Sequence, residues 1–361
     1  MLQNINDNII QSKTIDFLRF PLSIGVILIH TTIIKETENI LPNTFPIYES
    51  ITYLFIEILA QIAVPLFFLI SGFLFFIKVD KFTFDVYLTK IKKRIHSLLI
   101  PYMFWNAIFI LCYFLGQLFL KDYLLGQRKP FLDYSIQEWI LSFWNFDGIK
   151  YDLPINGPMW FIRDLIVVVI LSPLIYSVLK YLRHYSIIFL GFFWFLNIWF
   201  HIPGFSITAL FFFSTGAYLG LYKKNLIAIT RPLMKPCFIS YIIFVSINFI
   251  FRDYEWISYI KKINILIGII LAISLSAYYI QTKGIEINKK LSSSTFFIFA
   301  FHIIPITIFS RILRSISHSD WELTLSYFMC AIITTAVSLS AYIILNRYLP
   351  RITSYITGGR T

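Results

Sequence analysis

Residues 15–30 read IDFLRFPLSIGVILIH and open the first of several apolar runs long enough to span a membrane. Three polar side chains that are costly to place in a lipid hydrocarbon core interrupt this run, namely Asp16, Arg19 and His30. An arginine at the middle of a spanning helix costs about 2.5–3.5 kcal/mol on insertion scales, so such a charge usually faces a protein interior or a wet cavity. The run therefore predicts a membrane helix with one polar face.

The spacing of these groups supports a shared face. Arg19 and His30 are eleven residues apart, about 1100° at about 100° per residue, which is within about 20° of a whole number of turns. We therefore expect them on one side of the helix, about 16 Å apart along its axis. Asp16 stands three residues before Arg19, a spacing at which helical side chains pair. Snorkelling of Arg19 and a structural role for His30 are the alternatives, but the common face favours a site.

The composition is that of an integral membrane protein rather than a soluble enzyme. Of 361 residues, 58% are hydrophobic, 19% aromatic and 14% charged, and the mean hydropathy is +0.73. The net charge of +12 does not indicate nucleic-acid binding, because the basic residues fall in short loops between apolar runs. Cys112, Cys237 and Cys330 lie within apolar runs without metal-type spacing, so we expect neither a disulfide nor a metal site.

Ten membrane-spanning helices are predicted, which makes residues 1–361 a single all-α, polytopic helix bundle. The expected ranges are 15–34, 52–77, 98–120, 156–179, 186–200, 205–222, 237–251, 263–281, 292–310 and 323–346. Lys and Arg gather in every second loop, most densely at 78–97, so the positive-inside rule places both termini in the cytoplasm. The first span lacks the flanks of a removable signal peptide.

Residues 121–157 form the longest polar stretch and are predicted to be an extracytoplasmic loop. Apolar residues recur within it at helical spacing, which predicts an amphipathic helix on the membrane surface. These residues are Ile136, Trp139, Ile140, Phe143 and Trp144.

Several polar side chains are candidates for chemistry. Histidine is the side chain best suited to moving protons near neutral pH, and His30 lies toward the far side of the membrane. The basic cluster of Lys93, Arg94 and His96 suits an anionic, phosphate-bearing donor; alternatively, it only holds its loop in the cytoplasm. Candidate supporting groups are Asp16, Glu57, Trp160, His302 and the pair Arg163 and Asp164, which we expect to form a buried ion pair.

The motif D-x-x-R-x10-H formed by Asp16, Arg19 and His30 resembles the first span of the acyltransferase 3 family of multispan membrane acyltransferases. Other segments resemble that family in the same order along essentially the whole chain. They are VPLFFLISGFL, the basic run before LLIPYMFW, WFIRDL, FFFSTGAYLG and STFFIFAFH.

This resemblance implies transfer of an acyl group, usually acetyl, from cytoplasmic acyl-CoA to a hydroxyl of a cell-surface glycan or glycolipid. It implies a location in the bacterial cytoplasmic membrane, acetyl-CoA or another acyl-CoA as co-substrate, and no permanently bound cofactor. Arg19 and His30 match the family's Arg and His, with His30 as the expected base or proton carrier. Arg94 matches the first Arg of an R-x-x-R pattern, whereas Ser97 stands at the second position.

Other functions remain open at this point. A transporter or flippase could move a polysaccharide or lipid-linked sugar without acyl chemistry, since buried charges also mark transport paths; no inverted repeat is evident in the sequence. The enzyme could instead act on a lipid, an antibiotic or a peptidoglycan sugar, or the chain could be a structural partner in glycan synthesis. The sequence does not identify the acceptor, the acyl group or the oligomeric state.

Overall fold

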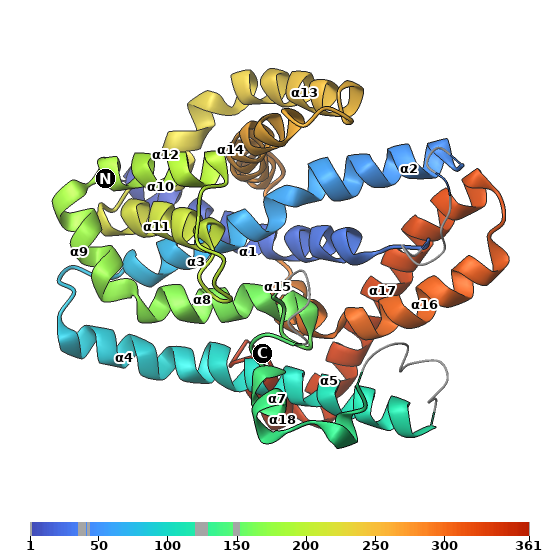
Figure 1. The fold of residues 1–361 in the computed structure, drawn as a ribbon. Helices are drawn as coiled ribbons and strands as arrows, with labels where there is room; N and C mark the ends of the chain where they lie inside the picture. The colour runs from blue at the N-terminus through green and yellow to red at the C-terminus, as the bar shows by residue number, and fades with distance from the viewer. Residues whose placement is uncertain (1, 35–40, 42–43, 120–128, 147–151, 361) are drawn as a thin grey trace.

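The structure is a computed structural model that describes residues 2–34, 41, 44–119, 129–146 and 152–360. Every regular element in these ranges is helical, which confirms the predicted all-α class (Figure 1). In chain order the helices are α1 (Leu2–His30), α2 (Pro46–Thr52), α3 (Ala63–Phe76), α4 (Phe84–Arg94), α5 (Ile100–Phe119), α7 (Ile136–Leu141), α8 (Trp160–Ile170), α9 (Ser172–Leu182), α10 (His184–Leu196), α11 (Ile207–Leu221), α12 (Leu226–Thr230), α13 (Met234–Ile250), α14 (Ile257–Lys283), α15 (Lys289–Phe301), α16 (Ile303–Ile316), α17 (Asp320–Tyr348) and α18 (Pro350–Ile356).

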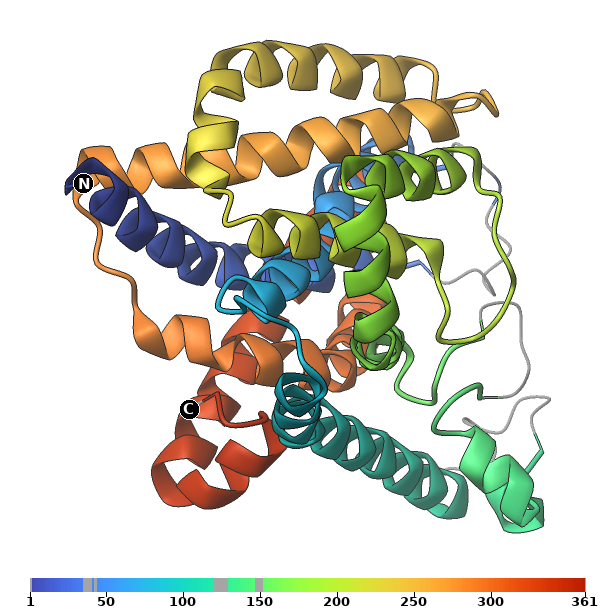
Figure 2. The same cartoon turned by 90° about the vertical axis from the view of Figure 1, so that its left-hand side faces the viewer.

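Helix α1 occupies the middle of the bundle, between helices from both halves of the chain (Figure 1). It packs against α3, α14, α15 and α17, and its apolar side is buried at Leu18, Leu22 and Val26. The view in Figure 2 shows α13 and α14 on one side of α1 and the α4–α5 helix on the other. The side chains on this face of α1 therefore point to the protein interior, whereas others, such as Ile9 and Pro21, are exposed.

The described residues contain five helices that are long and apolar enough to cross a membrane, or up to seven if two bent pairs each count as one span. The five are Pro46–Phe76, Phe84–Phe119, Leu226–Ile250, Ile257–Lys283 and Asp320–Tyr348; the pairs are α8–α9, bent by 63°, and α15–α16, bent by 68°. Helix α1 is not among them because Lys13, Asp16 and Arg19 interrupt its apolar run. All ten predicted segments fall on helices, while the count of ten spans and the cytoplasmic termini stay predictions.

The basic stretch at 78–97 was predicted to be a loop, and this was wrong for most of its length. Helix α4 begins after Thr83, whose side chain accepts a hydrogen bond from the Val86 amide. It continues through a π-helical turn, Ile95–Leu99, directly into α5. Lysine and arginine are good helix formers, and they occupy the last turn of α4, where they favour its carbonyl end.

The predicted amphipathic helix is present but short. Helix α7 starts with a capping box between Ser135 and Glu138 and ends at Leu141. Hydrogen bonds from Ser135 and Lys129 stabilise the Glu138 carboxylate and lower its pKa to about 2. Phe143 and Trp144 follow the helix instead of extending it, because the Trp144 indole donates to the Pro203 carbonyl at 3.1 Å. Residues 121–128 and 147–151 of the predicted loop lie outside the described residues.

Helices α3 and α11 meet almost backbone to backbone. A Cβ placed on Gly72 would overlap the Phe213 carbonyl, and one placed on Gly216 would overlap the Leu69 carbonyl. Gly216 and Gly220 are four residues apart, which is the small-residue spacing that lets membrane helices approach closely. This contact fixes the position of α3 relative to α11.

Gly216→Ala is expected to destabilise the protein, because the added methyl group would meet backbone atoms that cannot rotate away. Overpacking of this kind costs about 1–3 kcal/mol, so the thermal unfolding midpoint in detergent should fall by several degrees. Gly25→Ala is the matched control, since its Cβ would lie 3.5 Å from the Ala63 Cβ, an ordinary contact. Equal midpoints for the two variants would contradict the close α3–α11 contact.

Candidate active site

The predicted ion pair between Asp16 and Arg19 is present on α1. Arg19 Nη1 lies 2.9 Å from Asp16 Oδ1, and both side chains are partly exposed. This confirms the interaction that the three-residue spacing predicted. Asp16 can balance the charge of only one cation, so the charges of the other basic groups near Arg19 are not neutralised by it.

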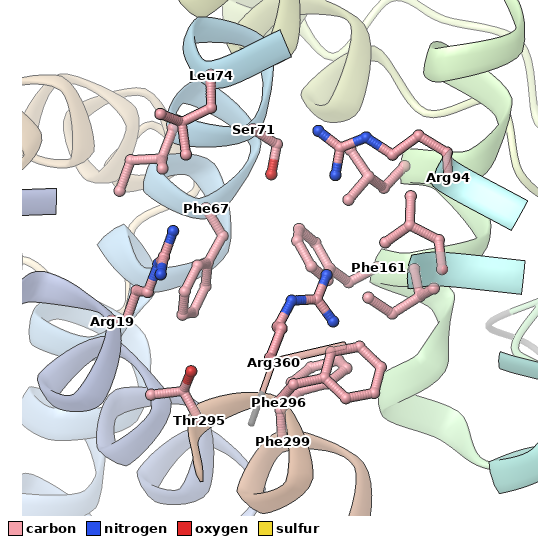
Figure 3. Close-up of a pocket in the computed structure, with 14 residues that line it drawn as sticks. Arg19, Phe67, Ser71, Leu74, Arg94, Phe161, Thr295, Phe296, Phe299 and Arg360 are labelled. Carbon is pink, nitrogen blue, oxygen red and sulfur yellow. The ribbon is translucent and has the colours of Figure 1, made fainter. Parts of the chain in front are cut away.

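Three guanidinium groups from distant parts of the chain surround one space. Arg19 from α1, Arg94 from α4 and Arg360 from the segment after α18 line a cavity of about 160 Å³, which we call the arginine cavity (Figure 3). Ser71 and Thr295 contribute hydroxyl groups to its wall. The other lining residues are apolar, namely Phe67, Ile70, Leu74, Leu98, Phe161, Ile162, Leu165, Phe296 and Phe299. The cavity therefore combines concentrated positive charge with a largely apolar wall.

The cations in this cavity affect one another. Burial and the nearby Arg94 and Arg19 lower the pKa of Arg360 to about 9, so the group stays protonated at neutral pH. Within the part of the chain that the structure describes, no carboxylate lies within ion-pair distance of Arg94 or Arg360. An anion would be bound here by planar guanidinium groups, which suit phosphate and carboxylate oxygens.

The predicted donor-binding cluster is divided in two. Arg94 faces the arginine cavity, whereas Lys93 and His96 line a separate hollow together with Ser97 and Gly358. Consecutive residues of a helix point about 100° apart, so Lys93 and Arg94 can line different hollows. Only Arg94 of the cluster is brought together with Arg19.

His30 lies at the other end of α1 and lines a second cavity, of about 360 Å³, which we call the histidine cavity. Trp160 borders the same cavity, as do Tyr113 and Phe146. The His302 ring lies beside His30, with 5.3 Å between the ring centroids. The structure thus brings together His30, His302 and Trp160, which the sequence had offered only as separate candidates.

His302 is placed by a bend in the chain. It joins α15 to α16 where their axes turn by 68°, and Pro305 follows three residues later with no amide hydrogen to bond the Phe301 carbonyl. The His302 side chain is fully buried, and its Nδ1 lies 2.7 Å from the Phe299 carbonyl oxygen. Its Nε2 has no hydrogen-bond partner among the described residues. A buried imidazole nitrogen without a partner is costly, and here it adjoins the ring of His30.

The two cavities have no lining residue in common. Phe161 and Phe299, whose ring centroids are 5.7 Å apart, line the arginine cavity. Trp160, the residue before Phe161, lines the histidine cavity. The two cavities are therefore separate in this structure, although neighbouring residues of α8 border both of them.

Glu57 pairs away from both cavities. It lies in a π-helical turn, Tyr53–Leu59, and accepts a hydrogen bond from the Lys261 ammonium at 2.7 Å. This contact joins the turn to α14. Glu57 therefore pairs with Lys261 and with none of the predicted site residues.

Arg163 and Asp164 form the predicted buried ion pair, with 3.1 Å between Arg163 Nε and Asp164 Oδ1. Arg163 Nη1 also donates to the carbonyls of Trp144 and Asp152, at 2.7 and 2.6 Å. Neither side chain lines the arginine or the histidine cavity. The pair fastens the loop before α8 to the bundle and so positions Trp160 at the start of that helix.

Sequence reasoning missed Arg360, Ser71 and Thr295 as site residues. No recognised motif contains Arg360. The local sequence signal is the Gly358–Gly359 pair before it, and in the structure these glycines have φ of 66° and 78°. Ser71 and Thr295 lie within segments that were recognised only as family-like apolar runs. Among the described residues, no group of three or more His, Cys, Asp or Glu side chains is arranged to hold a metal ion.

Comparison with known proteins identifies the family. The family profile described as an acyltransferase domain matches residues 12–343, which is most of the chain. The chain belongs to the acyltransferase 3 family. One curated member of similar length, the succinoglycan biosynthesis protein ExoH of Rhizobium meliloti (strain 1021), is 24% identical over 359 residues, covering 97% of this chain and 93% of ExoH. No solved structure matches this acyltransferase.

Removing one member of the buried ion pair is expected to destabilise this acyltransferase more than removing both. Asp164→Leu leaves Arg163 without its carboxylate, which typically costs about 3–5 kcal/mol for a buried charge. The double variant Arg163→Met with Asp164→Leu removes the unpaired charge and should recover part of that loss. The stability of both variants is measured by thermal unfolding of the detergent-solubilised protein, monitored by size-exclusion chromatography. A double variant less stable than Asp164→Leu alone would contradict this account.

Proposed function

We propose that this acyltransferase transfers an acyl group from acyl-CoA to a hydroxyl of a polysaccharide at the far side of the membrane. Acetyl is the group that the family resemblance favours. The observation that carries the proposal is the separation of two kinds of chemistry along α1. Guanidinium groups surround one cavity near Arg19, and two adjacent imidazoles border another near His30.

The arginine cavity supports an anionic donor. Coenzyme A carries its phosphates at one end and its thioester at the other, so the phosphates would pair with Arg19 and Arg94. The Ser71 and Thr295 hydroxyl groups offer further hydrogen bonds to phosphate oxygens. The thioester end would then extend between Phe161 and Phe299 toward His30, which requires these rings to rotate.

The histidine cavity supports the transfer step. His30 takes the proton from the acceptor hydroxyl, and the oxygen attacks the thioester carbonyl carbon. A carbon–oxygen bond forms, the carbon–sulfur bond breaks, and coenzyme A leaves as a thiolate that recovers the proton from His30. General-base assistance of this kind contributes about 10²–10⁴-fold. His302 lies beside His30 and holds the ring in place or shares its proton.

Two observations favour a polysaccharide as acceptor. The related ExoH is by name a succinoglycan biosynthesis protein, and the histidine cavity has an aromatic wall formed by Phe109, Tyr113, Phe146 and Trp160. Aromatic faces with a few polar groups suit the mixed apolar and hydroxylated surface of a sugar ring. The membrane location follows from the apolar helices of the bundle.

His30→Ala is expected to abolish acyl transfer without weakening donor binding, because the imidazole lies far from the arginine cavity. Transfer is measured by mass spectrometry of surface polysaccharide from cells with the wild type or the variant, and donor binding by calorimetry with coenzyme A. His201→Ala is the control, since His201 is exposed and borders neither cavity. Full acylation with the His30 variant would exclude its role as the base.

Arg19→Gln and Arg94→Gln are expected to raise the donor KM by about tenfold or more, because each removes a charge-assisted hydrogen bond worth about 1.5–3 kcal/mol. Initial rates of acyl transfer at varied acetyl-CoA concentration give this value.

A transporter without acyl chemistry would neither bind acetyl-CoA nor acylate the glycan. Export of unmodified polysaccharide that depends on the protein would support that alternative instead.

A further inference from the structure

The segment after α17 folds back onto the bundle. Helix α18 packs against α5 (Figure 2), where the Trp105 indole donates to the Ile356 carbonyl at 3.0 Å. Thr353 and Thr357 on this segment are fully buried. The segment is therefore part of the packed structure and not a loose extension of the last long helix.

Two glycines then turn the chain toward the arginine cavity. Gly358 and Gly359 both have positive φ, at 66° and 78°, a conformation that strains residues with a side chain. Gly358 also lies against the backbone of Ser97, so that a Cβ there would meet the Ser97 carbonyl oxygen at 2.5 Å. This close approach brings the next residues across the end of α4 and directs Arg360 into the cavity shown in Figure 3.

The Arg360 side chain has few partners of its own. Its guanidinium carbon lies 4.5 Å from the centroid of the Phe296 ring, and Nη1 donates to the Thr357 carbonyl at 2.9 Å. A guanidinium group has five N–H donors in a fixed planar arrangement. Most of its donors thus have no partner among the described residues, and the group shares the cavity with Arg19 and Arg94 without forming an ion pair to a described carboxylate.

This arrangement is poorly explained as a structural anchor. Three cations share a small cavity that no carboxylate of the described residues lines. Asp16 lies in a neighbouring hollow that Arg19 and Arg360 also border, and it already pairs with Arg19. Bringing like charges together in partly apolar surroundings opposes folding, and an apolar residue could fill the same space above Phe296 without that penalty. The charge is useful only if an anion enters the cavity.

We infer that Arg360 is a donor-binding residue that contacts the phosphate groups of the acyl donor together with Arg19 and Arg94. This inference rests on the proposed function and adds to it that Arg360, in the segment after α18, forms part of the wall of the donor site. The ligand class is a molecule with at least two phosphate charges and a long uncharged arm, as in an acyl-coenzyme A. Arg360 stabilises the bound phosphates and takes no part in the proton transfer at His30.

Arg360→Gln tests this inference in the purified full chain, with coenzyme A as the probe in calorimetry. Loss of one guanidinium contact should raise the Kd by about tenfold or more. The dependence of log Kd on log salt concentration should also become less steep, because one fewer cation meets the phosphates. With acetyl-CoA as substrate, KM should rise while kcat changes little. Arg351→Gln is the matched control, because Arg351 lies exposed on α18 and borders neither cavity.

The outcomes separate this inference from the proposed function. If the wild type binds coenzyme A and Arg360→Gln binds it equally well with the same salt dependence, the role of Arg360 is wrong and the donor assignment stands. If the wild type does not bind coenzyme A, the proposed donor is wrong and the inference falls with it. Should Arg360→Gln fail to fold, Arg360→Lys keeps the charge but not the planar fork; a weaker Kd in that folded variant supports the contact, and a wild-type Kd overturns it.

Discussion

A cation inside an apolar protein must be matched by an anion or by polar atoms, and this requirement distinguishes the site from the rest of the bundle. Away from the site the matching is internal: Arg163 has Asp164 and two carbonyls, and Lys261 has Glu57. At the arginine cavity it is incomplete, because Arg94 and Arg360 have no carboxylate among the described residues. In the proposed function, the counter-charge is supplied by the phosphates of the donor.

The features that were predictable from sequence are local ones. The Asp16–Arg19 and Arg163–Asp164 pairs were recognised because neighbours on a helix are fixed by its geometry. The positions of the helices followed from apolar runs, and the family followed from motifs spread along the chain. The short α7 and the helical basic stretch were misjudged at their boundaries, where Trp144 is held by Pro203 and Thr83 caps α4.

The remaining features depend on contacts between distant residues. Nothing near Arg360 indicates that it reaches Arg19, because this follows from Gly358 packing on Ser97, 261 positions earlier in the chain. Ser97, the position at which the family resemblance would place a second Arg, lies against Gly358 and lines a hollow apart from the arginine cavity. The pairing of His30 with His302 likewise depends on the bend near Pro305.

The rigid geometry of α1 limits which donors fit the site. Arg19 and His30 are about 16 Å apart along one helix, and the cavities that they line share no residue. A small donor with its charge next to the reactive carbon, such as an acyl phosphate, would place the carbonyl beside the guanidinium groups and far from the base. A donor whose anionic end and acyl carbon are separated by a long uncharged arm satisfies both cavities at once. In the proposed reaction, aromatic side chains around the thioester would exclude water until an acceptor hydroxyl reaches His30, which would favour transfer over hydrolysis.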